Sequence, residues 1–189
     1  YKEDSVALIS KRKNLPFPYH DCMKRISFFR HKYYSERYPL DSAIFISTED
    51  LYLYHDLAPQ ADEACTGVML FNVKNHASLT KKWFYKYESD VDSITNGGEQ
   101  THVNYEIQSN CKVQWLDYKF QAIWVYEMAW KYPFLYENSD KNIIKNCIES
   151  SLLSNYFLHF AGSWHESQMW KTSNVFSDYK FLEEYSQYL

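Results

Sequence analysis

Hydrophobic and polar positions along the first quarter of the chain predict a strand, a helix and a second strand. Residues 5–10 form an apolar run that ends in a basic, proline-containing loop, as is typical of a buried strand. From residue 19 to residue 38 apolar side chains recur at helical spacing, and Pro39 ends the helix. Residues 41–47 predict the second strand, and this order favours an α/β protein with parallel neighbours. The residues expected on the inner helix face are Met23, Ile26, Phe28 or Phe29, Tyr33 and Tyr34.

The periodicity of the remaining chain predicts further strands and helices. Apolar strands are expected at residues 68–73, 113–117 and 155–160, and helices at residues 79–88, 100–109 and 176–189. Residues 143–153 fit either a short helix or a loop, while residues 51–62 and 120–136 give no clear pattern. Because no repeat, low-complexity stretch or linker divides the sequence, we expect residues 1–189 to form a single domain.

Aromatic residues make up 19% of the chain, with 18 Tyr, 12 Phe and 6 Trp. Tyr and Trp combine an apolar body with a hydrogen-bonding tip, which suits clefts that bind sugars or nucleobases. A genomic bias toward tyrosine explains the same composition equally well. The formal net charge of −4 argues against a nucleic-acid partner, because general nucleic-acid binders carry a basic surplus. Two local basic clusters, at residues 11–13 and 24–32, are interpreted as solvated helix faces.

Cysteine spacing and hydropathy bear on the cellular compartment. The four cysteines are widely scattered without a Cys-x-x-Cys pair, which disfavours a zinc knuckle and predicts buried free thiols in a reducing compartment. No apolar stretch approaches the length of a membrane span, and no signal peptide opens the chain. We therefore expect no membrane span and a cytoplasmic location.

Three segments combine glycine or small residues with apolar runs and polar groups. Residues 65–72 read Cys-Thr-Gly-Val-Met-Leu-Phe-Asn, and residues 97–104 read Gly-Gly-Glu-Gln-Thr-His-Val-Asn. Residues 156–165 read Tyr-Phe-Leu-His-Phe-Ala-Gly-Ser-Trp-His. The last segment predicts a strand that carries His159 to the mouth of a site, with Gly162 letting a ligand approach the backbone. Taken in this order, the segments indicate an enzyme site.

The three segments resemble the C-terminal half of GT-A fold glycosyltransferases, particularly the retaining group of bacterial lipopolysaccharide galactosyltransferases and glycogenin-like enzymes. In that group Asn-small-Gly-Val-Met-Leu-x-Asn precedes Gly-Asp-Gln, and His-Phe-x-Gly closes the catalytic half. The resemblance covers roughly Cys65 to Trp170. It implies a GT-A-like, mostly parallel twisted sheet flanked by helices. It also implies transfer of a hexose, with retention, from a UDP- or GDP-linked nucleotide-sugar donor to a glycan or other hydroxyl acceptor.

The resemblance also implies roles for individual residues. Glu99 and Gln100 would be catalytic, lying across the donor sugar to orient the acceptor hydroxyl or to stabilise the transition state. His159 would bind a metal ion, Mn²⁺ or Mg²⁺, which stabilises the charge of the departing diphosphate. The donor-binding residues would be Thr66 and Gly67 at the sugar, Gly162 at a phosphate, and His165, or alternatively Lys171, in place of the usual lysine.

The chain departs from the family pattern at several positions. Cys65 stands where the family has an Asn that hydrogen-bonds the sugar, and Glu99 replaces Asp. No Asp-x-Asp metal element precedes Cys65, and the interval is too short for the usual metal loop. Either a segment between about residues 51 and 65 is absent, or the metal element has been lost. Asp90-Val91-Asp92 has the literal pattern but follows the glycine strand, and is interpreted as loop charge.

Other interpretations stay open beside the enzyme hypothesis. The missing Asp-x-Asp element and Cys65 also fit a catalytically silent glycosyltransferase-like module that binds a glycan or protein partner. A hydrolase that uses Glu99 needs a second carboxylate, and none identifies itself at a suitable spacing. His159 also fits a satisfied core or edge histidine, and Glu99 with Gln100 fits the acidic first turn of a helix. Thr66 and Gly67 also fit a plain lead into a strand.

Overall fold

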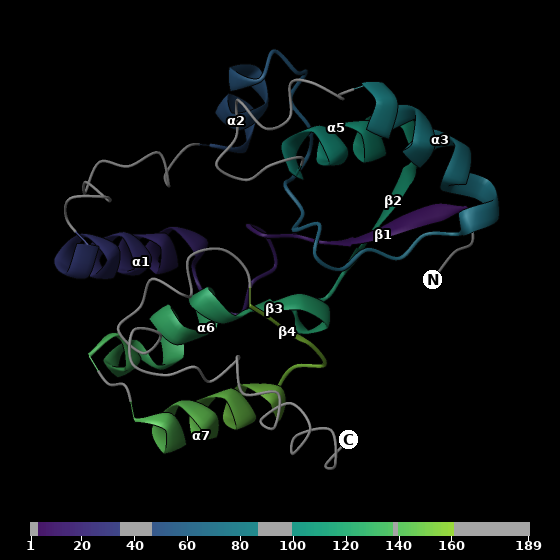
Figure 1. Cartoon of the computed structure of the whole chain (residues 1–189). Coiled ribbons are helices and arrows are strands. Elements are labelled where there is room, and N and C mark those ends of the chain that lie inside the picture. Colours follow the sequence, from purple (N-terminus) through teal and green to yellow (C-terminus); the bar gives the residue numbers. More distant parts are fainter. Residues whose placement is uncertain (1–3, 35–46, 87–99, 138–139, 161–189) are drawn as a thin grey trace. The chain divides into compact units, whose positions relative to one another are not determined.

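The computed structural model describes residues 4–34, 47–86, 100–137 and 140–160 (Figure 1). The chain divides into two compact units. Unit 1 contains Tyr1–Tyr19 and Ala43–Gln121, and unit 2 contains His20–Ser42 and Ala122–Leu189. Both units combine helices with short parallel strands, so the predicted α/β class is confirmed. Within the described ranges the strands form two separate two-stranded sheets, and a single GT-A-like twisted sheet stays a prediction.

The sheet of unit 1 confirms two of the predicted strands. β1 (Ser5–Ile9) pairs in parallel with β2 (Lys112–Leu116), so that Leu8 lies opposite Trp115. All five residues of β1 are buried, which explains why this strand is a continuous apolar run rather than an alternating one. Single antiparallel bridges join Ala7 to Leu70 and Ser10 to Ala64, so the segment around residues 64–70 runs beside β1.

The described part of unit 1 also contains the α-helices α2 (Thr48–Tyr54), α3 (Val73–Lys86) and α5 (Gln100–Asn110) and a 3-10 helix, η2 (Tyr118–Gln121). The helices α3 and α5 pack on the face of β1 that carries Val6 and Leu8 (Figure 1). The core cluster consists of Val6, Leu8, Ala64, Trp83 and Ile107, with Met69, Leu79, Val103, Cys111, Val113 and Trp115 packed against it. The predicted helices at residues 79–88 and 100–109 are confirmed where they are described, and α3 begins six residues earlier than expected.

The prediction of a strand at residues 68–73 is wrong. Only the bridge at Leu70 has strand character, and α3 already begins at Val73. The cause is Asn72, whose side-chain Oδ1 accepts hydrogen bonds from the backbone N–H groups of Lys74 (2.9 Å) and Asn75 (3.4 Å). An asparagine in this position satisfies the free N–H groups of a first helical turn, so it starts a helix where the apolar run alone indicates a strand.

Unit 2 contains α1 (Tyr19–Tyr34), whose first residue belongs to unit 1, and five further described helical or strand segments after residue 121. Met23 and Ile26 are buried on α1 as predicted. Phe29 is the inward residue of the Phe28/Phe29 pair, because it stacks on Tyr136 with ring centroids 4.3 Å apart while Phe28 is exposed. The other elements of unit 2 are β3 (Ala122–Ile123), α6 (Trp124–Lys131), the 3-10 helix η3 (Pro133–Tyr136), α7 (Lys141–Leu152) and β4 (Leu158–His159).

The structure defines the secondary structure of two segments for which the sequence pattern made no single prediction. Residues 143–153 belong to the helix α7, whose N-cap Asp140 accepts hydrogen bonds from the backbone N–H groups of Asn142 (2.8 Å) and Ile143 (3.4 Å). Residues 120–136 divide into the 3-10 helix η2 (Tyr118–Gln121), β3, α6 and η3, none long enough for a clear periodicity. The strand expected at 155–160 shortens to β4, which pairs in parallel with β3.

The remaining sequence predictions divide into confirmed ones and ones outside the described residues. All four cysteines are free thiols, and Cys22, Cys65 and Cys147 are buried, as predicted. Within the described ranges, no helix combines the length and apolar character that crossing a membrane requires. The strand at 41–47 falls outside the described residues except at Ser47, and the helix at 176–189 falls outside them altogether.

Candidate functional site

Unit 1 holds three of the predicted site residues. Thr66 and Gly67 form a turn after the Ser10–Ala64 bridge, and Gln100 is the first residue of α5. His159 lies in β4 of unit 2. Glu99, Gly162 and His165 lie outside the described residues, as do Asp90 and Asp92.

The chain turns sharply where β1 ends, and this turn positions two cations. The Ser10 hydroxyl accepts hydrogen bonds from the backbone N–H groups of Arg12 (3.0 Å) and Lys13 (2.7 Å). The Lys11 N–H donates to the Glu63 carbonyl at 2.8 Å. A serine side chain that bonds to the next residues stabilises a turn, so residues 11–13 are not the solvated helix face that their charge pattern indicated.

The buried carboxylate of Glu63 is the centre of the site. Its Oε1 accepts from Lys11 Nζ at 2.7 Å and from Gln100 Nε2 at 2.9 Å, and its Oε2 accepts from Arg12 Nε at 2.8 Å. Burial alone would raise the pKa of Glu63, but the charges and hydrogen bonds of Lys11 and Arg12 outweigh burial and hold it below the usual value. The carboxylate is therefore ionised at neutral pH, although its side chain is only 5% exposed.

Asn104 joins α5 to Ala64, the residue directly before the segment 65–72. Its side-chain Oδ1 accepts from the Ala64 N–H at 2.7 Å, and its Nδ2 donates to the carbonyls of Ala64 (2.8 Å) and Gln100 (2.9 Å). Because Asn104 is 1% exposed, these hydrogen bonds have no competition from water. Ala64, which directly precedes Cys65, and the first turn of α5 at Gln100 therefore lie together near the end of β1.

The turn of Thr66 and Gly67 is more accessible than the cysteine before it. Cys65 is 5% exposed, and its N–H donates to the Ile9 carbonyl at 3.3 Å. Burial raises the pKa of the Cys65 thiol, against smaller lowering contributions that include the Gly67 backbone and the Gln121 side chain. The thiol is therefore protonated at neutral pH and faces the interior, whereas Thr66 is half-buried and Gly67 is exposed.

A second set of hydrogen bonds holds the Glu63 segment in place. Tyr52 donates from its hydroxyl to the Asp62 carbonyl at 2.9 Å, and Gln108 Nε2 donates to the same carbonyl at 2.7 Å and to the Tyr52 hydroxyl at 3.1 Å. Burial raises the pKa of Tyr52, so its hydroxyl keeps its proton. The helices α2 and α5 are thereby tied to the residues just before Glu63.

The strand pairing described for His159 lies within unit 2. It is half-buried and pairs with Ile123 across the sheet. Burial lowers its pKa, which favours the neutral imidazole that metals bind. Across the described ranges, no three His, Cys, Asp or Glu side chains gather as a metal site would require. The described residues therefore do not complete a metal site around His159.

Glu63 and Asn104 were not singled out from the sequence. Asn104 carries a weak signal, because it is a polar residue within the apolar spacing of a predicted helix. Glu63 carries none, because its partners are distant in the chain. No family model, no curated protein and no solved structure matches the chain. Its function is therefore inferred from these residues and their geometry.

Proposed function

We propose that this chain is a hexosyltransferase with a GT-A-like fold that takes a hexose from a UDP- or GDP-linked nucleotide sugar. The acceptor is a hydroxyl group of a glycan or a similar molecule. One observation carries the proposal. Asn104 and Glu63 connect Gln100 with residues 63–64, shortly before the turn of Thr66 and Gly67, through hydrogen bonds of 2.7–2.9 Å. Gln100 belongs to one of the segments on which the family resemblance rests, and Ala64 directly precedes another.

The position and charge of the cluster support an anionic donor. Open α/β sheets bind ligands at the carboxyl ends of their parallel strands, and the cluster lies where β1 ends. The three cations of residues 11–13 outnumber the carboxylates of Asp62 and Glu63 there. A diphosphate leaving group gains negative charge as the glycosidic bond breaks, and fixed cations stabilise that charge.

The hydrogen bond between Gln100 and Glu63 supports a positioning function for the amide. Because Gln100 Nε2 donates to Glu63, the amide plane is held and its Oε1 remains an acceptor for a sugar or acceptor hydroxyl. Glu99 precedes this amide in the sequence and is proposed as the catalytic carboxylate. Thr66 and Gly67 are proposed to line the sugar, with Gly162 and His165 near the phosphates.

The proposed metal site is independent of the proposal of hexosyl transfer. His159 is proposed as a ligand of Mn²⁺ or Mg²⁺, because its neutral imidazole suits that function. The described residues supply no further ligands, so no catalytic step is assigned to the metal. The hexosyl transfer is argued from the cluster of unit 1 alone.

A panel of UDP- and GDP-sugars with Mn²⁺ tests the proposal. We expect one donor to raise the melting temperature and to be hydrolysed slowly without an acceptor. The Gln100→Ala variant should lower that hydrolysis by about 10²-fold, the usual loss when a group that positions or stabilises the transition state is removed. Gln60→Ala is the matched control, because Gln60 is a half-buried glutamine of the same unit that bonds only to the nearby Ala58 carbonyl among the described residues. No shift and no hydrolysis with any donor would refute the proposal.

A second function, a catalytically silent module that binds a glycan or protein, is favoured by Cys65. Its buried, protonated thiol is a poor substitute for the amide that family members offer to the sugar. Metal titration separates the two functions. An active transferase should bind Mn²⁺ more tightly in the presence of its donor, and His159→Ala should abolish that gain. A silent module should show no such coupling.

A further inference from the structure

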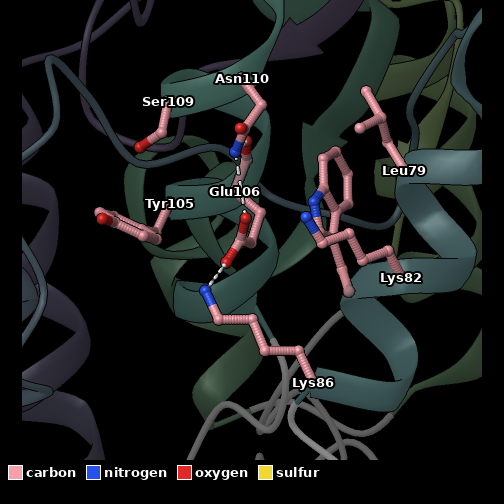
Figure 2. A pocket seen from close by; sticks show the side chains of 8 residues that line it. Leu79, Lys82, Lys86, Tyr105, Glu106, Ser109 and Asn110 are labelled. Carbon is pink, nitrogen blue, oxygen red and sulfur yellow. Dashed lines mark hydrogen bonds and ion pairs between the residues drawn. The ribbon is translucent and has the colours of Figure 1, made fainter.

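A second site in unit 1 lies between the helices α3 and α5 (Figure 2). The pocket has a volume of about 320 Å³. Small-molecule pockets span roughly 300–1,000 Å³, so this one has room for a single sugar ring. Its walls are Leu79, Lys82, Trp83 and Lys86 from α3, and Tyr105, Glu106, Ser109 and Asn110 from α5.

The floor of the pocket belongs to the hydrophobic core. Trp83 is 7% exposed and packs in one cluster with Ile107 of α5 and Leu8 of β1. Leu79 packs against the same cluster. Because core side chains are closely packed and keep their rotamers, the pocket is formed before a ligand arrives.

Lys82 gives the pocket a positive charge that no described residue neutralises. Glu106 is buried, and its carboxylate already bonds Lys86 Nζ at 2.5 Å and Asn110 Nδ2 at 3.1 Å. Within the described part of the chain, Lys82 makes no ion pair or hydrogen bond. Figure 2 shows its side chain reaching from α3 toward α5, across the pocket.

Neutral hydrogen-bonding groups of α5 line the same pocket, and in Figure 2 the side chains of Tyr105 and Ser109 lie on the other side of Glu106 from Lys82. The hydroxyls of Tyr105 and Ser109 make no hydrogen bond to any residue of the described ranges. Asn110 uses its Nδ2 for the backbone carbonyl (2.8 Å) and the carboxylate of Glu106, so its Oδ1 is still an acceptor. Two hydroxyls and one amide oxygen beside an indole are the groups that hydroxylated rings use for binding.

We propose that the pocket between α3 and α5 binds a monosaccharide that carries one anionic group, a carboxylate or a phosphate. The anionic group pairs with Lys82, and Lys86 adds a second positive charge beside it. The sugar hydroxyls bond to Tyr105, Ser109 and Asn110, and the ring lies over the apolar floor. The inference does not depend on glycosyl transfer, because none of these residues belongs to the cluster at the end of β1.

Isothermal titration calorimetry with four probes tests this site: glucuronate, glucose 6-phosphate, glucose and inorganic phosphate. The first two separate the carboxylate from the phosphate, glucose lacks the charge, and inorganic phosphate lacks the ring. We expect one of the charged sugars to bind at least about tenfold more tightly than glucose or inorganic phosphate, as a charge-assisted hydrogen bond allows.

Two lysine variants locate the binding. Lys82→Gln should weaken binding of the charged sugar about tenfold. Lys81→Gln is the matched control, because Lys81 is an exposed lysine of the same helix that does not line the pocket, and it should leave affinity unchanged. Ser109→Ala should weaken the charged sugar and not inorganic phosphate. The proposal is overturned if neither charged sugar binds, if Lys81→Gln has the effect of Lys82→Gln, or if inorganic phosphate binds equally well.

Discussion

The buried carboxylates of Glu63 in unit 1 and Glu127 in unit 2 are held by different kinds of partner. Glu63 bonds to Lys11, Arg12 and Gln100, which are 52, 51 and 37 residues away in the sequence. Glu127 bonds to Lys131, one turn along its own helix, at 2.5 Å, and to Ser151 of α7 at 3.1 Å. The charge of Glu127 is neutralised locally, whereas that of Glu63 is neutralised only in the folded unit.

This difference separates a structural carboxylate from one that organises a site. Glu127 is fully buried, and its bond to Ser151 joins α6 to α7. Glu63 lies where a parallel strand ends, beside a half-buried amide that the sequence itself had indicated as functional. A buried ion pair is weak evidence for net stability. We therefore expect the Glu63 cluster to contribute mainly by fixing the positions of Lys11, Arg12 and Gln100.

The largest expected effect comes from removing the charge of Glu63. Glu63→Gln leaves Lys11 and the largely buried Arg12 without their carboxylate, and should lower the free energy of unfolding by about 3 kcal/mol. Glu127→Gln should cost about 1–2 kcal/mol, because Lys131 is one-third exposed and can turn to solvent. Urea unfolding followed by hydrogen exchange in each unit measures both. Equal losses would remove the distinction between the two carboxylates.

The next effect compares the hydrogen bonds that join segments in the two units. Asn104→Ala leaves the N–H and carbonyl of Ala64 and the carbonyl of Gln100 without that side chain, and should cost about 2–3 kcal/mol. Ser151→Ala removes one hydroxyl from Glu127 and should cost about 1 kcal/mol. Asn104→Ala should also lower donor binding, whereas Ser151→Ala should not. If donor binding survives in both variants, the junction at Asn104 is only structural.

The pH dependence of stability sharpens the interpretation of Glu63. Its pKa in the folded state lies below the ordinary value of 4.5, so its stabilising contribution is complete above about pH 4.5 and is lost as pH falls through the folded-state pKa. Unfolding curves between pH 7 and pH 3 should fall less steeply for Glu63→Gln than for the unchanged protein. Identical slopes would contradict the ion pairs.

The smallest expected effect comes from an ion pair outside both clusters. Lys32 and Glu137 of unit 2 lie 2.5 Å apart, but their side chains are 45% and 59% exposed. Solvent screening and side-chain entropy limit such pairs, so Glu137→Gln should change stability by no more than about 0.5 kcal/mol. A loss as large as that in Glu127→Gln would show that burial is not what distinguishes these carboxylates.

Local patterns account for the parts of the fold that were predicted. The apolar run at residues 5–10 and the helical spacing around Met23 and Ile26 are properties of neighbouring residues, and both elements form as expected. The error at residues 68–73 has a local cause as well, because Asn72 caps a helix that begins inside the expected strand. The segment from 120 to 136 resisted prediction because its elements are too short to repeat a pattern.

The candidate site divides in the same way. Gln100, Thr66 and Gly67 were selected from short motifs, and the basic residues 11–13 were recognised as a cluster. By itself the sequence determined the α/β class, the helices α1, α3 and α5, and which residue types are candidates for chemistry. Only the tertiary structure decided that Lys11 and Arg12 neutralise Glu63, and that Asn104 joins the segments before Cys65 and at Gln100. The physical reason is range, since periodicity and capping act within a few residues, whereas a buried charge finds its partners wherever the folded chain brings them.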